Sequence, residues 1–429
     1  MIRNLSIETL AFGGSGVGRL DGKVIFVPFT APGDVVDCRI VRERKRYAEG
    51  ELVQVGTPSP GRRTPPCPVF GECGGCQWQH LSYEAQSAWK SRIFGDILQR
   101  QCRLPAERLK SLVPAPREWG YRSRVQFKCR QTANGFVMGY YRRGSHFVVD
   151  VSHCPIAHPR LNEVLTYLRR HLPMGPFPER IPQVDLAVGD DGRVRAEVHW
   201  AGEGAETLTP VLDRLAMDGG FSCFLQTGRK ETLRRVHGEQ DLLLEVDHPP
   251  LQLAYGPGGF AQVNLEQNKA LVSEVVRETQ LSGRERVLDL FCGMGNFSLP
   301  LARRAAEVVG VEDYAPSIEK ARHNARVNGV GNARFFARPA QGAAAEMGKA
   351  AAFDLVLLDP PRTGAYQVAK ELVATAPRRI LYVSCDPPTL ARDLMPLLHG
   401  GYSVVWSRPF DLFPQTHHIE SLTLLTRAG

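Results

Sequence analysis

A cysteine stands at the end of a predicted buried strand, in the turn Val-Ser-Cys-Asp-Pro of residues 383–387. If the strand belongs to a parallel sheet, the thiol of Cys385 lies at the carboxyl edge, where ligands bind. A buried cysteine is in general a packing residue, but a polar turn that contains proline favours a reactive thiol. Cys385 is therefore the candidate nucleophile for covalent catalysis.

A glycine turn follows an earlier strand. Residues 287–298 read Val-Leu-Asp-Leu-Phe-Cys-Gly-Met-Gly-Asn-Phe-Ser, which predicts a strand, a turn and a helix start. Gly293 and Gly295 let the backbone approach a ligand, and Glu312 at the end of the next strand suits two ribose hydroxyls. Together they resemble the first two motifs of Rossmann-type adenosylmethionine methyltransferases. A nicotinamide site or a plain βα turn is the alternative.

Asp359 opens a third motif, Asp-Pro-Pro-Arg, after a further predicted strand. The motif resembles the Asp/Asn-Pro-Pro-aromatic sequence of amino methyltransferases, which act on exocyclic nitrogen. Arg362 stands where their aromatic residue stacks on a flipped base. This departure counts against methylation of nitrogen.

Glu420 is the candidate general base. It ends the sequence His-His-Ile-Glu of residues 417–420, before the last predicted strand, and can return to the edge that carries Cys385. A thiolate with a carboxylate suits methylation of uracil carbon 5. The thiolate adds to carbon 6, carbon 5 attacks a sulfonium methyl group, and the base removes the carbon 5 proton. His417 and His418 are competing bases.

The chain has ten cysteines, and without a secretory signal they favour metal binding or catalysis over a disulfide scaffold. Cys67, Cys73 and Cys76 lie in one Pro- and Gly-rich loop, and Cys154 follows farther along the chain. Three close cysteines and a distant fourth fit a site of four thiolates. By spacing alone, an iron–sulfur cluster and zinc are both reasonable.

The net charge of +8 is concentrated in one segment. Residues 86–130 contain eleven Lys and Arg against three Asp and Glu, a local excess of 11 − 3 = 8. Clustered positive charge favours a phosphate-bearing partner, with a solvated basic face as the alternative. Arg122 and Arg124 are the candidate RNA contacts, with internal ion pairs as the alternative for them.

The 429 residues predict a multi-domain α/β protein of two to four domains. Residues 1–59 hold short β-rich runs that predict an OB-like barrel, and residues 60–255 predict an α+β domain. Strands and helices alternate in residues 256–429, which predicts a doubly wound parallel sheet. No apolar stretch suits a membrane helix and no signal core begins the chain, so we expect a cytoplasmic protein.

Together the motifs resemble those of the bacterial 23S ribosomal RNA (uracil-5-)-methyltransferases that carry a TRAM domain and a four-iron four-sulfur cluster. The resemblance covers nearly the whole chain. It rests on residues 67–77, 120–124, 152–156, 260–264, 289–293, 359–362, 384–387 and 418–420. It implies a TRAM barrel, a central iron–sulfur domain and a Rossmann-like domain that uses S-adenosyl-L-methionine.

The resemblance also implies roles for single residues. It makes Cys385 the nucleophile and Glu420 the base. It places the 4Fe-4S cluster on Cys67, Cys73, Cys76 and Cys154. It implies cofactor contacts from Gln262, Phe291, Asn296, Glu312 and Asp359. The family's adenine-contacting Asn or Asp is replaced by Pro339, which has no N–H to donate; Gln341 is the candidate substitute, and the contact stays unassigned.

Related transfer-RNA enzymes lack the cysteine cluster and the TRAM domain, so the resemblance favours 23S ribosomal RNA as the partner of a monomeric enzyme. Two alternatives stay open. An RNA cytosine-5 methyltransferase would need a group that protonates cytosine N3, and such enzymes have a different cysteine motif. A non-catalytic RNA-binding or ribosome-assembly factor would need the basic segment and the barrel but no pair such as Cys385 and Glu420.

Overall fold

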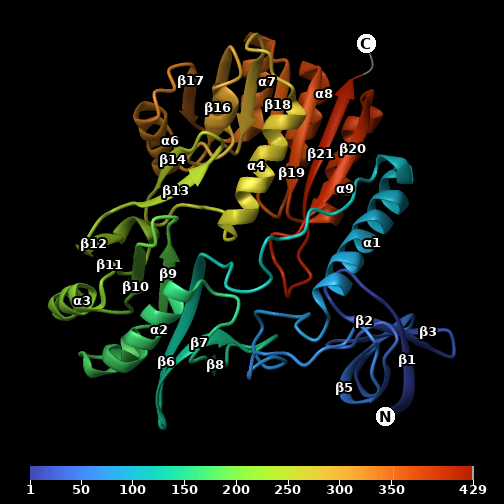
Figure 1. Ribbon diagram of the computed structural model, residues 1–429, viewed down its shortest axis with the longest axis vertical. Coiled ribbons are helices and arrows are strands. Elements are labelled where there is room, and N and C mark those ends of the chain that lie inside the picture. The colour runs from blue at the N-terminus through green and yellow to red at the C-terminus, as the bar shows by residue number, and fades with distance from the viewer. Residues whose placement is uncertain (351, 428–429) are drawn as a thin grey trace.

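The computed structural model describes residues 1–350 and 352–427, which Figure 1 shows as three lobes. The N-terminal lobe is a closed barrel with the strand order β1-β2-β3-β5-β4. Its strands are β1 (Ile2–Leu10), β2 (Gly16–Leu20), β3 (Lys23–Val27), β4 (Val35–Glu43) and β5 (Tyr47–Thr57). Leu5, Ile25 and Val27 fill its core. Closure leaves no free sheet edge, and the predicted OB-like barrel is confirmed.

The second lobe is built on a seven-stranded sheet with the order β12-β11-β10-β9-β6-β7-β8. Its strands are β6 (Arg124–Thr132), β7 (Gly135–Tyr141), β8 (Val148–Asp150), β9 (Gln183–Val188), β10 (Val194–His199), β11 (Ser222–Gln226) and β12 (Arg234–His237). Helices α2 (Pro159–His171) and α3 (Ala205–Gly219) share one hydrophobic core with the sheet. Val125, Phe127 and Cys129 of β6 point into that core. Because side chains alternate along a strand, Gln126 and Lys128 lie on the opposite face.

The third lobe is a doubly wound sheet with the order β17-β16-β15-β18-β19-β21-β20. Its strands are β15 (Arg286–Leu290), β16 (Glu307–Glu312), β17 (Ala333–Ala337), β18 (Leu355–Leu358), β19 (Arg379–Ser384), β20 (Tyr402–Phe410) and β21 (Glu420–Arg427). The first five strands in this order run parallel, and β21 is antiparallel to both neighbours. The predicted parallel sheet is confirmed. Its order reverses between β15 and β18, which opens a binding crevice at their carboxyl ends.

Helices link and cover the strands of this sheet. They are α4 (Leu265–Thr279), α5 (Ser298–Ala302), α6 (Ala315–Val327), α7 (Ala340–Ala350), α8 (Tyr366–Thr375) and α9 (Pro387–His399). Short 3-10 turns occur elsewhere in the chain, at Ala106–Arg108, Leu172–Met174, Pro178–Arg180 and Lys230–Thr232. Within the described ranges, none of the helices has the length and apolarity to cross a membrane.

Two segments from the region predicted as a central domain pack into the third lobe. Helix α1 (Tyr83–Cys102) lies beside α9, and its Phe94 and Leu98 share a core with residues of that helix. The hairpin of β13 (Leu242–Val246) and β14 (Leu251–Tyr255) packs with α4 and α6 in the core on the other side of the sheet. The third lobe is therefore larger than residues 256–429, because long-range packing adds segments to it.

Candidate active site

The pairing of β19 with β21 brings Cys385 and Glu420 to the same place. The ladder runs in register to Ser384 opposite Ser421, and Cys385 and Glu420 are the next residues along the two chains, close enough for the Glu420 carboxylate to act on the Cys385 thiol. The Ser421 hydroxyl donates a hydrogen bond of 3.1 Å to the Ser384 carbonyl, which fixes this end of the ladder. The two residues that the sequence analysis singled out for covalent catalysis thus meet at the carboxyl edge of the sheet.

Burial controls the protonation of this pair. Glu420 is 2% exposed, and burial, reinforced by the carboxylate of Asp359, raises its pKa well above the usual range. Burial and the neighbouring Glu420 raise the pKa of Cys385 to about 12. The nearby guanidinium of Arg362 opposes both shifts but is outweighed by burial. The net upward shift of the Cys385 pKa favours the protonated thiol near neutral pH.

Acidic side chains gather along this edge. Burial raises the pKa of Asp289 to about 7 and, together with the carboxylates of Asp289 and Glu312, raises that of Asp359 to about 8. The pKa of Glu312 is raised mainly by burial. One oxygen of Asp289 accepts a hydrogen bond from Ser298, and the other, Oδ1, has no hydrogen-bond partner in the described residues. A cationic ligand would stabilise the ionised forms of these groups.

The glycine turn after β15 has the geometry that its sequence predicted. The Gly293 N–H donates to Glu312 at 3.3 Å, and the Tyr314 N–H donates to the other oxygen of Glu312 at 3.0 Å. Gly293 has φ +53°, and a Cβ there would meet no atom within 4 Å. Phe291 also has positive φ. The turn leaves open space beside a carboxylate, which fits the ribose of adenosylmethionine.

Among the other predicted cofactor contacts, Asn296 is held in place by local hydrogen bonds. Asn296 exchanges amide hydrogen bonds of 2.8 and 3.0 Å with Asn268 on α4. Gln262 is 8% exposed in the loop between β14 and α4. Pro339 follows β17, and Gln341 is exposed beside it. The adenine contact stays unassigned, and the roles of these side chains stay predictions.

The four predicted cluster cysteines line one cavity of about 240 Å³ together with Arg362 and His418. Burial, with a smaller contribution from the neighbouring thiols, raises the pKa of Cys73 to about 11 and that of Cys76 to about 12. In the described residues, no group of three or more His, Cys, Asp or Glu forms a site for a metal ion. The thiols thus surround a shared space without closing on a single ion, and the cluster stays a prediction.

Arg124 is committed to contacts inside the protein. Its guanidinium lies 3.5 Å from the carboxylate of Asp185 and donates to the Gly259 carbonyl at 3.3 Å, with 25% of the side chain exposed. Arg122 donates to the Arg124 carbonyl at 2.9 Å and lines the cysteine cavity. For Arg124 the structure favours the internal ion pair over the RNA contact, whereas Arg122 lies close to the site.

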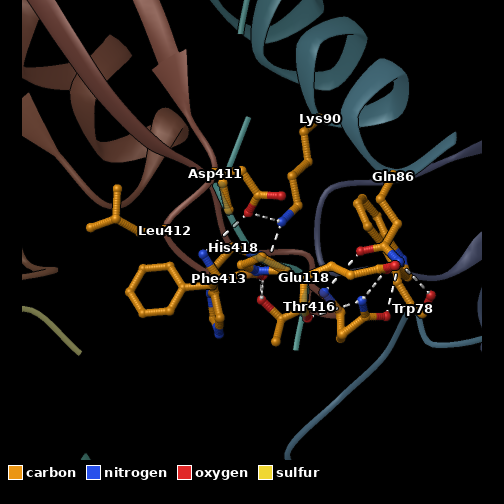
Figure 2. A network of polar contacts seen from close by, with 12 residues as sticks. Trp78, Gln86, Lys90, Glu118, Asp411, Leu412, Phe413, Thr416 and His418 are labelled. Atoms are coloured by element: carbon orange, nitrogen blue, oxygen red, sulfur yellow. Dashed lines mark hydrogen bonds and ion pairs between the residues drawn. The ribbon is translucent and has the colours of Figure 1, made fainter. Parts of the chain in front are cut away.

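Sequence reasoning missed the contacts that hold the loop between β20 and β21, residues 411–419, which leads into Glu420 (Figure 2). Lys90 of α1 forms an ion pair of 2.6 Å with Asp411, and both residues are 0% exposed. The Lys90 ammonium also donates to the Phe413 carbonyl at 2.9 Å. The sequence did contain a signal for these contacts. Gln86 and Lys90 are spaced four residues apart, on the same face of α1 as the buried Phe94, so their side chains could be expected to be buried and to need polar partners.

Gln415 joins this loop to the cysteine loop. Its side chain accepts from the Gln86 amide at 3.0 Å, and its backbone N–H donates to Gln86 at 2.8 Å. Its carbonyl accepts the N–H groups of Gln77 and Trp78 at 3.0 Å each. The Trp78 indole donates at 3.0 Å to the Gly14 carbonyl, in the turn between β1 and β2. One network therefore connects barrel, cysteine loop and catalytic edge.

The closed barrel and the acidic, cysteine-bearing edge of a doubly wound sheet define a Rossmann-like methyltransferase with a TRAM domain. The TRAM domain family matches residues 2–53, and the tRNA (Uracil-5-)-methyltransferase family matches residues 228–428. The 23S rRNA (uracil(1939)-C(5))-methyltransferase RlmD of Alkalilimnicola ehrlichii is 38% identical over 99% of this chain and 96% of its own length. RlmD of Shewanella amazonensis is 36% identical over 98% and 94%. The chain belongs to the RNA (uracil-5-)-methyltransferase family.

A solved structure agrees over the full length. The Pyrococcus abyssi tRNA (uracil-54, C5)-methyltransferase in complex with S-adenosyl-L-homocysteine superposes with a TM-score of 0.77 and 26% identity, over 99% of this chain and 100% of that one. A transfer-RNA enzyme therefore shares the whole architecture, the barrel included. The expectation that such enzymes lack the barrel is wrong in this case. The architecture alone does not distinguish a ribosomal from a transfer-RNA target.

Proposed function

We propose that the protein methylates carbon 5 of a uridine in 23S ribosomal RNA, with S-adenosyl-L-methionine as the methyl donor. The observation that carries the proposal is the β19–β21 ladder, whose last pair, Ser384 and Ser421, supports Cys385 and Glu420 as neighbours at the carboxyl edge. The ribosomal target is supported by the names of relatives that share nearly the full chain length, and uracil 1939 in those names is the first target to test. The acidic edge and the open glycine turn suit a ligand with a sulfonium and a ribose.

In the proposed reaction, the Cys385 thiol loses its proton to solvent and the sulfur adds to carbon 6 of the uracil, while the ring electrons move to carbon 5 and the carbon 4 oxygen as an enolate. Carbon 5 then attacks the methyl group that bound adenosylmethionine would supply, and the sulfonium carbon–sulfur bond breaks to leave S-adenosylhomocysteine. Glu420 then accepts the carbon 5 proton, the ring double bond re-forms, and Cys385 leaves as a thiolate. Attack at carbon 6 needs access to the ring face, so the uridine must leave its stack at a cost of a few kcal/mol.

We expect the protein to transfer labelled methyl groups from adenosylmethionine to unmodified 23S ribosomal RNA, and digestion to yield 5-methyluridine from one region of that RNA. Unmodified transfer RNA serves as the matched substrate, because the P. abyssi relative acts on tRNA. Label in 5-methylcytidine would select the cytosine alternative. Label only in transfer RNA would overturn the ribosomal assignment. No transfer of label to either RNA would favour the alternative of a non-catalytic RNA-binding factor.

A four-iron four-sulfur cluster held by Cys67, Cys73, Cys76 and Cys154 is part of the proposal. The shared cavity supports it, because a cluster is wider than one ion and needs space between its thiolates. The reaction moves no electron to or from the protein. We therefore assign the cluster the task of holding the cysteine loop against the catalytic edge.

Protein purified without oxygen should be brown and contain about four irons per chain. A Cys154→Ser variant should lose that iron, whereas Cys102→Ser on α1 should keep it, because Cys102 lies outside the cavity. Metal analysis and the visible absorption spectrum measure both variants without any reference to activity. Stoichiometric zinc in place of iron would contradict the assignment.

A further inference from the structure

A large groove lies on the face of the second lobe that α2 and α3 leave uncovered. It has a volume of about 610 Å³ and runs between the cysteine loop and the β7–β8 hairpin. The groove shares Gly75 and Tyr140 with the cysteine cavity, and that cavity reaches Arg362 and His418 beside the catalytic pair. The groove and the cysteine cavity therefore adjoin each other at the cysteine loop, on the side of that loop away from the catalytic pair.

The groove is cationic. Lys128, Arg142 and Arg143 line it, and among the described residues that line it none is acidic. The carboxylate of Glu72 lies 3.2 Å from Arg142, but both side chains are at least half exposed, so this ion pair is weak. The Arg143 guanidinium stands 5.8 Å from the ring of Phe29, at the barrel. The positive charge thus spans the junction of barrel, cysteine loop and hairpin.

Exposed aromatic rings alternate with these cations. Tyr141 lines the groove and is 38% exposed, and Phe147, which lies beside the groove in the β7–β8 hairpin, is 59% exposed. The Lys128 ammonium lies 5.4 Å from the Tyr141 ring, and the Arg142 guanidinium lies 4.9 Å from the Phe147 ring. Surfaces that bind single-stranded nucleic acid usually combine aromatic rings, on which successive bases stack, with cations along the path of the phosphates.

The hairpin is fixed to the cysteine loop and not free to drift. The Gly74 N–H donates to the Tyr141 carbonyl at 3.0 Å, and the Arg143 N–H donates to the Glu72 carbonyl at 3.3 Å. A Cβ at Gly74 would already stand 3.0 Å from that Tyr141 oxygen. The cations and rings of the hairpin therefore keep a set position relative to the catalytic edge.

We infer that this groove binds the single-stranded RNA that flanks the target uridine, with Lys128, Arg142 and Arg143 on the phosphates and Tyr141 and Phe147 under the bases. The inference rests on the proposed function and gives it an RNA path. It assigns the phosphate contacts to a surface outside the pair Arg122 and Arg124, the second of which is engaged with Asp185.

The test uses the full-length protein and a single-stranded fragment of 23S ribosomal RNA that the wild type methylates. Arg142→Gln/Arg143→Gln should weaken binding about tenfold at low salt and lower the slope of log affinity against log salt by about 1.4, at about 0.7 per lost phosphate contact. Tyr141→Ala should weaken binding about tenfold with an unchanged slope, because stacking releases no counterions. The KM for RNA should rise while kcat and adenosylmethionine affinity stay unchanged.

Two controls separate the inference from an effect of net charge and from a loss of structure. Arg170→Gln/Arg214→Gln removes two exposed charges from α2 and α3, on the covered face of the same sheet, and should leave affinity and slope unchanged. Glu72→Gln removes the acid beside Arg142 and should tighten binding, a change of sign that misfolding does not produce.

The inference fails if the wild type methylates RNA and Arg142→Gln/Arg143→Gln keeps its salt slope and its KM for RNA. Equal loss of affinity in the Arg170→Gln/Arg214→Gln control would also overturn it, because the effect would then be one of net charge. Tighter binding of duplex than of single-stranded RNA in the groove would overturn the single-stranded assignment. The salt series measures RNA binding and needs no methyl transfer. If the wild type binds RNA but transfers no methyl group, the proposed function is refuted, whereas the inference about the groove is not.

Discussion

Replacing Cys385 with Ala should lower methyl transfer by about 10,000-fold or more, because the route through carbon 6 loses its only nucleophile. Adenosylmethionine binding should stay close to that of the wild type, since the acids that face a cationic ligand come from other strands. Transfer of labelled methyl groups and calorimetric titration of the cofactor measure the two effects. Cys102→Ala on α1 is the matched control and should keep full turnover, because Cys102 packs at the carbonyl of Ala391.

Replacing Glu420 with Gln should instead trap a methylated protein–RNA adduct. Addition and methyl transfer precede removal of the carbon 5 proton, so a protein without its base stops with sulfur still bonded to carbon 6. The adduct should survive a denaturing gel and carry the label of the methyl donor. The double variant Cys385→Ala/Glu420→Gln should form none. His417→Gln and His418→Gln should still complete the methylation of RNA. If either variant accumulated the adduct, that histidine and not Glu420 would be the base.

The third lobe could be predicted from sequence because its signals are local. Alternating apolar strands and helices after residue 256 define a parallel sheet, and parallel strands present their carboxyl ends at one edge. The glycine turn, Asp359 and Cys385 each follow a strand and Glu312 ends one, so the convergence of these residues could be predicted without knowledge of side-chain packing. Glu420 could be proposed in the same way, because it precedes the last predicted strand, and the β19–β21 ladder ends one residue short of it, at Ser384 and Ser421.

What the sequence did not predict depends on contacts between distant segments. Lys90 and Asp411 are 321 positions apart, and Gln86 and Gln415 are 329 apart. Charge counting between residues 86 and 130 treated each cation as equivalent, although Lys90 is fully buried and Arg124 is paired inside. The sequence of the β13–β14 hairpin predicts two strands but does not indicate the domain to which they belong. Only its packing shows that it joins the core of the third lobe.

The buried pair of Lys90 and Asp411 has the largest expected effect on stability. Removal of one partner from a buried ion pair costs about 3–5 kcal/mol, because the remaining charge is left in a medium that cannot solvate it. Lys90→Met keeps the length of the side chain but leaves the Asp411 carboxylate without its cation, and the second oxygen of Asp411 already has no hydrogen-bond partner in the described residues. The same variant removes the donor to the Phe413 carbonyl.

We therefore expect Lys90→Met to lower the free energy of unfolding of the third lobe by about 3–5 kcal/mol, measured by urea denaturation. The double variant Lys90→Met/Asp411→Leu should recover much of that loss, since two apolar side chains replace an ion pair with little net cost. Arg100→Met, on the same helix with 81% of its side chain exposed, is the control and should change stability by less than about 0.5 kcal/mol. A double variant less stable than Lys90→Met would contradict the argument, because the cost would then lie in lost packing. The loop from Asp411 leads into Glu420, so Lys90→Met that remains folded should also lower kcat and leave the KM for adenosylmethionine unchanged.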